Sequence, residues 1–317
     1  MYNFNREEYS MYKKILGFKQ PTLLKAMEVF LGKYYSKVIA TNKFIVAFGD
    51  IPIALCAHLD TVFVTPPKKI FYDKDNGVIW SPEGCGHDDR AGVYMIMKII
   101  QKGYRPHIIF TTDEEIGCEG AEALCKYENP FEDLKYIIQL DRRGIDDCVF
   151  YYGDNQEFIK YVESFGFREA KGSFTDIVFL CPEWEVCGTN LSVGYENEHT
   201  YAEYLDVTVF HNTMNKVIKM LENPPTVEFE YTEKPGKFLF HNFAAGCKCE
   251  KCGQSVFEPS EDLFPVKFGK EYKEICIECM MAGVNWCVNC NEAFATTNPE
   301  AVFCDECEEK IKKGGQD

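Results

Sequence analysis

The chain has 317 residues, of which 46% are apolar, 15% aromatic and 26% charged, and this composition excludes intrinsic disorder and low-complexity architectures. Its 50 acidic residues outnumber its 34 basic residues and leave a net charge of -16. Nucleic acid and anionic membranes are therefore disfavoured as partners, because both carry negative charge.

The apolar periodicity predicts alternating helices and strands over the first two-thirds of the chain. In chain order we expect helices near 6–16 and 21–36, strands near 43–48, 52–57 and 69–80, a helix near 90–102, a strand near 107–112, a helix near 119–127, strands near 136–141 and 148–152, a helix near 155–165, strands near 176–180 and 186–193, and a helix near 206–222. This order predicts an α/β fold with a mixed central sheet flanked by helices. In such folds the site lies beyond the carboxyl ends of the strands.

The cysteines divide the chain into two parts. Seven of the 16 are scattered singly through the first two-thirds and are typical of core filling, whereas nine crowd into the last quarter. Prolines at 224, 225 and 235 mark a break between the two parts. We therefore predict a domain over 1–223, a linker over 224–236 and a small Cys-rich module over 237–317.

Targeting signals are not evident in the sequence. No segment approaches the ~20 apolar residues that span a bilayer, and the segment MYNFNREEYSMYKK lacks the apolar core of a secretion signal. A cytoplasmic location is therefore expected. Cysteines in a reducing compartment are more typical of metal sites or apolar cores than of disulfides.

Two polar clusters precede the middle of the chain. Strand 52–57 runs into His58 and Asp60, which project to the same side of an extended chain, so that Asp60 can orient the imidazole. Such a pair alone is more often structural. The segment GCGHDDRAG then opens a helix with Asp88 and Asp89, and helix capping is the alternative to metal binding there.

Three further clusters follow later strands. The strand near 107–112 leads into DEEIG, with three consecutive acids that repel one another by roughly 1 kcal/mol per close pair in water. A solvated turn is the alternative, but a pair of bound cations explains the crowding better. Asp141 ends the next strand, where Arg142 could be its structural partner, and the segment ENEHTYAE with His199 precedes the last helix.

Taken together, the order His, Asp, Glu-Glu, Asp, His resembles the dinuclear zinc exopeptidases, the aminopeptidases and carboxypeptidases with a phosphorylase/hydrolase-like α/β fold. The motifs AHLDTV, GHDDRAG, TTDEEIGCEG, LDRRG and NEHTYAE carry this resemblance, which covers roughly residues 20–222. Relatives of the carboxypeptidase type insert a dimerisation or lid domain before the last histidine. Only 57 residues separate Asp141 from His199 here, which favours the compact aminopeptidase type.

The resemblance implies a role for each motif residue. It implies metal ligation by His58, Asp88, Glu115, Asp141 and His199, with Asp88 bridging two ions, and catalytic roles for Glu114 as general base and Asp60 as the acid that orients His58. It also implies a cis peptide bond between Asp88 and Asp89. The pair Thr175-Asp176 resembles a substrate-side or structural acidic motif of some relatives.

The chemistry implied is hydrolysis of a peptide bond by a hydroxide that bridges two divalent ions. Histidine with carboxylates suits zinc, and Mn or Co can occupy such a site. The expected activity is that of an aminopeptidase or dipeptidase on short peptides. The alternatives are an amidohydrolase or deacylase with the same centre, and a zinc-ribbon adaptor on an inactive scaffold.

Four Cys-x-x-Cys pairs in the last quarter are a strong signal for structural zinc. The predicted ligands of two ions are Cys249, Cys252, Cys276, Cys279, Cys287, Cys290, Cys304 and Cys307, with Cys247 as a spare. Sequential and cross-braced pairings both fit the spacing. The module is acidic, so contact with protein or self-association is expected of it rather than nucleic-acid binding.

Overall fold

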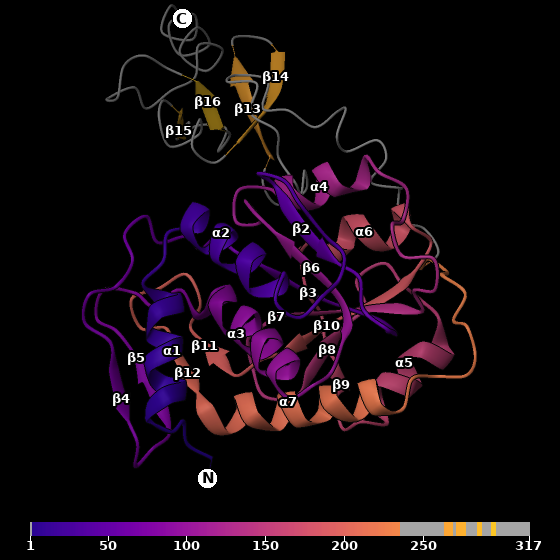
Figure 1. Ribbon diagram of the computed structural model, residues 1–317. Coiled ribbons are helices and arrows are strands. Elements are labelled where there is room, and N and C mark those ends of the chain that lie inside the picture. The colour runs from indigo at the N-terminus through magenta and orange to yellow at the C-terminus, as the bar shows by residue number, and fades with distance from the viewer. Residues whose placement is uncertain (1, 235–262, 269–270, 277–283, 287–292, 296–317) are drawn as a thin grey trace, which may run out of the picture. The chain divides into compact units, whose positions relative to one another are not determined.

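The computed structural model describes residues 2–234, 263–268, 271–276, 284–286 and 293–295 (Figure 1). The chain divides into two compact units, Met1–Lys237 and Phe238–Asp317. In the described part of the chain, no helix combines the length and the apolar character that crossing a membrane requires.

The first unit is built on an eight-stranded mixed sheet of order β1-β2-β6-β3-β7-β10-β8-β9. Its strands are β1 (Val38–Ala40), β2 (Phe44–Ala47), β3 (Ile51–His58), β6 (Pro106–Thr111), β7 (Tyr136–Arg142), β8 (Asp147–Val149), β9 (Arg168–Glu169) and β10 (Cys187–Ser192). The four central strands β6, β3, β7 and β10 run parallel, and antiparallel neighbours flank them on both sides. The carboxyl ends of the central strands therefore meet at one edge of the sheet.

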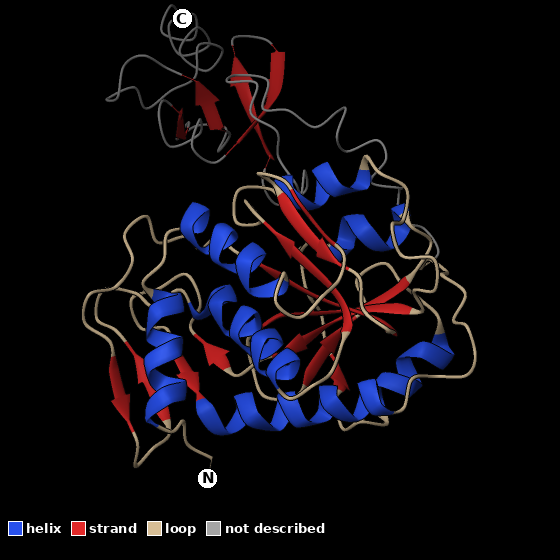
Figure 2. Ribbon diagram, viewed as in Figure 1, coloured by secondary structure: helices blue, strands red, loops and turns tan. Residues whose placement is uncertain are grey.

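Helices cover both faces of this sheet, as Figure 2 shows. They are α1 (Arg6–Leu16), α2 (Gln20–Leu31), α3 (His87–Gln101), α4 (Glu119–Cys125), α5 (Gln156–Glu163), α6 (Ile177–Glu183) and α7 (Val207–Glu222). Successive β3 residues alternate between two apolar cores: Leu55 belongs to the core that includes residues of α1, α2, α3, α5 and α7, and Cys56 belongs to the core that includes residues of α4 and α6. The predicted α/β architecture, a mixed sheet between helical layers, is confirmed.

A second, four-stranded sheet has the order β11-β12-β5-β4. Its strands are β4 (Phe71–Asp73), β5 (Val78–Trp80), β11 (Tyr195–Glu196) and β12 (Tyr204–Asp206). The single strand predicted over 69–80 is thus a hairpin. The Asp73 carboxylate accepts hydrogen bonds from the backbone N–H of Asp75 and Asn76 and closes its turn.

The strand predicted near 176–180 is wrong, because these residues begin α6. Ile177, Val178 and Phe179 are residue types with high strand propensity, which favours a strand when the sequence is read locally. The buried positions of the segment, Ile177, Val178, Leu180 and Cys181, follow the spacing of one helix face, and they pack against the sheet from α6. Tertiary packing has overridden local propensity here.

The second unit contains a four-stranded sheet of order β14-β13-β16-β15. Its strands are β13 (Leu263–Phe268), β14 (Glu271–Cys276), β15 (Val284–Trp286) and β16 (Ala293–Ala295). Cys276 is the last residue of β14, and the other seven predicted zinc ligands and Cys247 lie outside the described residues. The structural zinc sites therefore remain a prediction.

Gly92 allows α3 to lie directly against β7. A Cβ at this position would overlap the carbonyl oxygen of Leu140 and the carboxylate of Asp89. We expect Gly92→Ala to lower the free energy of unfolding by about 1–3 kcal/mol, measured by denaturant titration, because a packed backbone must move. Gly32→Ala is the matched control, since its Cβ would meet only ordinary contacts. Equal stability of the two variants would contradict the packing argument.

Candidate metal centre

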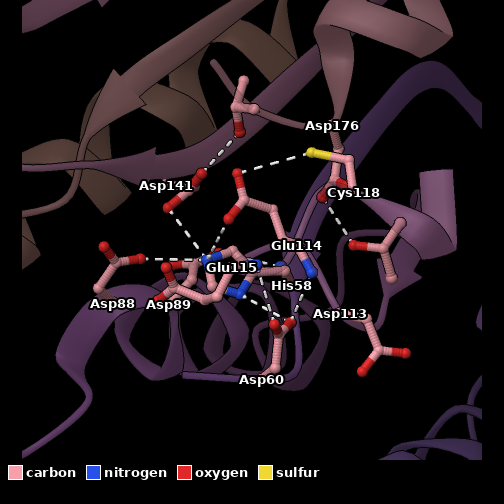
Figure 3. A network of polar contacts seen from close by, with 12 residues as sticks. His58, Asp60, Asp88, Asp89, Asp113, Glu114, Glu115, Cys118, Asp141 and Asp176 are labelled. Atoms are coloured by element: carbon pink, nitrogen blue, oxygen red, sulfur yellow. Dashed lines mark hydrogen bonds and ion pairs between the residues drawn. The ribbon is translucent and has the colours of Figure 1, made fainter. Parts of the chain in front are cut away.

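His58 ends β3 with its imidazole fully buried. Its Nδ1 lies 3.2 Å from Asp60 Oδ1, and its Nε2 faces the carboxylates of Asp88, at 3.1 Å, and Asp141, at 3.4 Å. Asp60 also accepts hydrogen bonds from the backbone N–H of Glu114 and Glu115, so it connects the segment after β3 to the one after β6. The result is an imidazole held in one orientation, with Nε2 among carboxylates (Figure 3).

Asp88 presents one carboxylate oxygen to each histidine. Its Oδ1 lies 3.1 Å from His58 Nε2 and its Oδ2 lies 3.2 Å from His199 Nε2. Burial alone would raise the pKa of Asp88, but the hydrogen bonds with His199 and His58 hold this pKa below its ordinary value. The carboxylate of Asp88 is therefore placed to contribute one oxygen to each of two cation sites.

Asp89 has a different role, although it is adjacent in sequence. The peptide bond between Asp88 and Asp89 is cis, as the resemblance implies. The Asp89 carboxylate is fully buried and accepts hydrogen bonds from the backbone N–H of His58, at 3.2 Å, and Gly92, at 3.0 Å. Burial and the nearby Asp141 raise the pKa of Asp89. Asp89 therefore fastens the start of α3 to the end of β3.

Glu114 and Glu115 follow β6 and point to different partners. Glu115 Oε2 lies 3.0 Å from His199 Nε2. Glu114 Oε2 lies 3.9 Å from His58 Nε2, and its Oε1 accepts a hydrogen bond from the Cys118 thiol at 3.7 Å. Burial raises the pKa of Glu114 well above its ordinary value. The two adjacent acids thus occupy distinct environments at the same strand end.

Asp141 lies near the end of β7 and is held from several sides. Its Oδ2 accepts a hydrogen bond from Thr175 Oγ1 at 2.7 Å, and its Oδ1 accepts one from the Tyr195 hydroxyl at 3.2 Å. Burial and the negative charge of Asp88 raise the pKa of Asp141 to about 7. A carboxylate fixed in this way is aimed at His58.

His199 belongs to the loop between β11 and β12 and is half exposed. Its φ of 63° is left-handed, and Thr200 Oγ1 donates a hydrogen bond to the Asn197 carbonyl, which closes the turn around it. Hydrogen bonds with Asp88 and Glu115 raise the pKa of His199 to about 11. His199 thus lies on the solvent-facing side of the cluster.

The five predicted ligands come together as two groups. The first contains His58, Asp88 and Asp141, and the second contains Asp88, Glu115 and His199; within each group the ligand atoms lie within 4.8 Å of one another. Glu115 Oε1 is buried without a hydrogen-bond partner among the described residues. Two sets of imidazole and carboxylate donors, with an unsatisfied carboxylate oxygen, fit a pair of divalent cations such as zinc.

Some residues that support the centre were not identified from the sequence. Glu203 is fully buried and accepts hydrogen bonds from the backbone N–H of Gly86, at 2.6 Å, and Asp88, at 3.0 Å. Burial raises the pKa of Glu203 to about 7. Its place in the segment ENEHTYAE was the available signal, whereas nothing in the sequence marked Tyr195. The pair Thr175-Asp176, by contrast, was noted in the sequence: Asp176 accepts a hydrogen bond from Thr111 at 2.6 Å, and Thr175 donates one to Asp141.

We expect Glu203→Ala to lower the free energy of unfolding by about 1–3 kcal/mol, because two buried N–H donors lose their acceptor. Metal affinity should fall about 10–100-fold, as is usual when a group that orients a ligand is removed. Denaturant titration and metal titration measure the two effects. Glu196→Ala, on the neighbouring strand β11, is the matched control, and an equal metal affinity in both variants would contradict the anchoring role.

Two histidines outside the proposed ligand set, His87 and His107, are buried in the core. His87 is buried, with Nδ1 at 2.7 Å from the Tyr12 hydroxyl and Nε2 at 3.1 Å from the Ile79 carbonyl oxygen. His107 Nε2 lies 3.0 Å from Asp133. Both rings are thus satisfied within the core, whereas His211 is partly buried and its Nε2 has no hydrogen-bond partner among the described residues. His241 lies outside the described residues.

Fold and site together define a protein with the α/β fold of the zinc exopeptidases and a cluster suited to two cations. Peptidase family M20/M25/M40 matches residues 54–157, a segment that contains His58, Asp88, Glu115 and Asp141. No curated protein sequence gives a significant match.

Solved peptidase structures share this fold at low sequence identity. A tripeptidase from Staphylococcus aureus is 12% identical, with a TM-score of 0.56, over 68% of this chain and 97% of that one. Aminopeptidase PepT from Bacillus cereus is 15% identical, with a TM-score of 0.52, over 69% and 98%. A TET aminopeptidase from a marine sediment Thaumarchaeota archaeon is 12% identical, with a TM-score of 0.55, over 70% and 98%.

Proposed function

We propose that the protein is a metal-dependent exopeptidase, an aminopeptidase or dipeptidase that hydrolyses short peptides. The observation that carries the proposal is the position of Asp88 between His58 and His199, with Asp141 and Glu115 completing two groups of donors. Two cation sites that share one carboxylate are typical of dinuclear hydrolases. The family match over 54–157 and the fold shared with solved peptidases support the same reaction class.

We propose zinc as the resident metal, with Mn or Co as substitutes that the same donors accept. His58, Asp88 and Asp141 would hold one ion, and Asp88, Glu115 and His199 the other. Bound ions of this kind supply Lewis acidity, which activates water and polarises the scissile carbonyl. Asp60 fixes the His58 ring through Nδ1, so that Nε2 stays directed at the centre.

Glu114 is the proposed general base. Its carboxylate lies beside the first group, 3.9 Å from His58 Nε2, and it belongs to neither group of donors. The Cys118 thiol donates a hydrogen bond to Glu114 Oε1, and Glu114 Oε2 is directed toward the centre (Figure 3). A carboxylate with a pKa raised by burial can accept a proton from the attacking water and return it to the leaving amine.

The substrate would enter a cavity of about 400 Å³ next to these residues. Its lining includes Asp88, Glu114, Glu115, Asp141 and His199. A cavity of this size accommodates a few residues of an extended peptide and not a folded protein. Short peptides with accessible ends are therefore the proposed substrates.

The direct test is hydrolysis of matched short peptides with a free and an acetylated amino terminus, assayed with and without metal. We expect the free peptide to be cleaved, activity to disappear after chelation and zinc to restore it. Preferential cleavage of the acetylated substrate would favour the deacylase alternative. Absence of cleavage of either substrate by zinc-loaded protein would contradict both enzymatic functions and favour the adaptor alternative.

Metal analysis provides a second readout. We expect two zinc ions that a chelator removes readily, held by the described groups. We further propose that the cysteine pairs of the last quarter hold two more, so that about four ions per chain are present before chelation. A chain that binds no chelatable zinc would contradict the dinuclear centre.

A further inference from the structure

A second cavity, of about 480 Å³, borders the metal centre. It is lined by Asp60, which orients His58, and by Glu115, which also lines the first cavity. Much of the remaining wall is apolar and includes Leu16, Phe18, Val62, Phe63, Val64 and Ile116. An apolar cavity that shares a wall with the site of chemistry is suited to part of the same substrate.

The rim of this cavity exposes apolar side chains to solvent. Val64 is 91% exposed, Ile116 is 67% exposed and Val62 is 40% exposed. The Phe63 ring contacts that of Tyr201, two residues after His199, with ring centroids 5.9 Å apart. Apolar residues gathered beside a polar centre indicate a binding surface rather than chance exposure.

Two of the three acids in the wall already have partners. Asp60 is engaged by His58 and by two backbone N–H groups, and Asp113 accepts hydrogen bonds from Gln20 and Lys43. The third, Glu115, has a carboxylate oxygen without a hydrogen-bond partner among the described residues, but it belongs to the second group of metal donors and would be committed to the proposed ion.

The positive charges in the wall are less fully engaged. Arg90 donates from Nη2 to the Phe18 carbonyl at 3.2 Å, whereas its buried Nε and Nη1 have no hydrogen-bond partner among the described residues. Lys19 lines the same cavity. An incoming ammonium or guanidinium group would meet Arg90 and Lys19 as like charges. It would also lose its hydration shell among largely apolar side chains, which costs affinity.

We propose that this cavity is the specificity pocket for a large apolar side chain next to the scissile bond, and that it disfavours lysine and arginine there. The inference rests on the proposed peptidase function and specifies its substrate class. One methylene group more or less in such a pocket changes kcat/KM by roughly 10–200-fold. Peptides with phenylalanine or leucine at this position are therefore expected to have a higher kcat/KM than peptides with alanine.

The first experiment compares dipeptides that differ in a single residue: phenylalanine, leucine, alanine or lysine, placed on either side of the scissile bond. For one of the two positions beside the scissile bond, we expect kcat/KM for the phenylalanine or leucine peptide to exceed that for the alanine peptide by about 10–100-fold. At the same position, kcat/KM for the lysine peptide should be lower than that for the alanine peptide. Lysine equal to or better than phenylalanine on both sides would overturn the inference.

The second experiment changes the wall of the cavity. Val62→Asp places a charge among apolar side chains, and we expect the ratio of kcat/KM for phenylalanine to alanine peptides to fall about 10-fold, mainly through KM. Val64→Asp, at a highly exposed position that tolerates a charge, should act in the same direction. Val227→Asp is the matched control, since Val227 is 54% exposed and lines neither cavity. An unchanged ratio in both pocket variants would overturn the assignment.

An equilibrium measurement separates failure of the pocket from failure of the proposed reaction. Calorimetric titration of zinc-loaded protein with the free amino acids L-phenylalanine and L-lysine, which have no amide bond to hydrolyse, needs no turnover. We expect phenylalanine to bind about 10-fold tighter, and Val62→Asp to remove this difference. Equal affinities contradict the pocket, whereas a clear preference without any peptide hydrolysis contradicts only the peptidase function.

Discussion

Glu114→Gln is expected to lower kcat for a short peptide by about 10²–10⁴-fold, the usual contribution of a positioned general base. The amide has nearly the shape of the carboxylate but cannot accept a proton from water at neutral pH. Glu114 belongs to neither group of metal donors, so bound zinc should remain near the wild-type level. Steady-state kinetics and metal analysis of the same preparation measure both quantities.

Glu119→Gln is the matched control for this experiment. Glu119 lies five residues further along, at the start of α4, where it pairs with Lys43 on the surface. We expect its kcat to stay within about 3-fold of wild type, because an exposed ion pair contributes little. A normal kcat for Glu114→Gln would remove Glu114 from the role of base, and a loss of zinc would reassign it as a ligand.

Asp88→Ala should have the largest effect on metal content, because this one side chain belongs to both groups of donors. We expect both chelatable ions to be lost and activity to fall by more than about 100-fold, the upper limit usual for residues that merely orient a ligand. His199→Ala removes a donor from the second group only, so this variant should retain one ion more firmly than the other. Metal analysis after dialysis measures the difference.

Asp75→Ala, in the exposed turn of the β4–β5 hairpin, is the matched control for aspartate removal. It should retain both ions. If Asp88→Ala retained one ion at full affinity, the two sites would not depend on a shared carboxylate, and the dinuclear arrangement would have to be abandoned for two independent sites.

Local patterns in the sequence place several candidate ligands at the ends of strands or at the start of a helix, whereas their roles as ligands came from the family resemblance. His58 and Asp141 end apolar runs that form central parallel strands, and the carboxyl ends of such strands meet at one edge. Asp88 lies in the first turn of α3, after a glycine-rich segment. Burial on both faces makes these runs strongly apolar, so they are easily recognised.

The supporting contacts could not be predicted, because they join residues far apart in the chain. Glu203 reaches the backbone of Gly86 across 117 positions, and Tyr195 reaches Asp141 across 54. No local pattern encodes such pairs. The α6 segment was mistaken for a strand for a related reason, since its helical state depends on packing against the sheet.

The Cys-rich module is the part for which sequence spacing remains the only guide to metal binding. Four Cys-x-x-Cys pairs predict two structural zinc ions, with contact to protein or self-association as the expected role. Zinc that resists chelation, and that is lost when Cys249 and Cys252 are both replaced by Ser, would support this prediction.

Asp88 joins two groups of donors whose other members extend from His58 to His199. During synthesis on a ribosome, the three donors of the first group have all emerged with Asp141, whereas the second group must wait for His199. Thr175, Tyr195 and Glu203, which hold Asp141 and Asp88 in place, also emerge after Asp141. Both cation sites would therefore reach their final geometry only once the segment around His199 has been made.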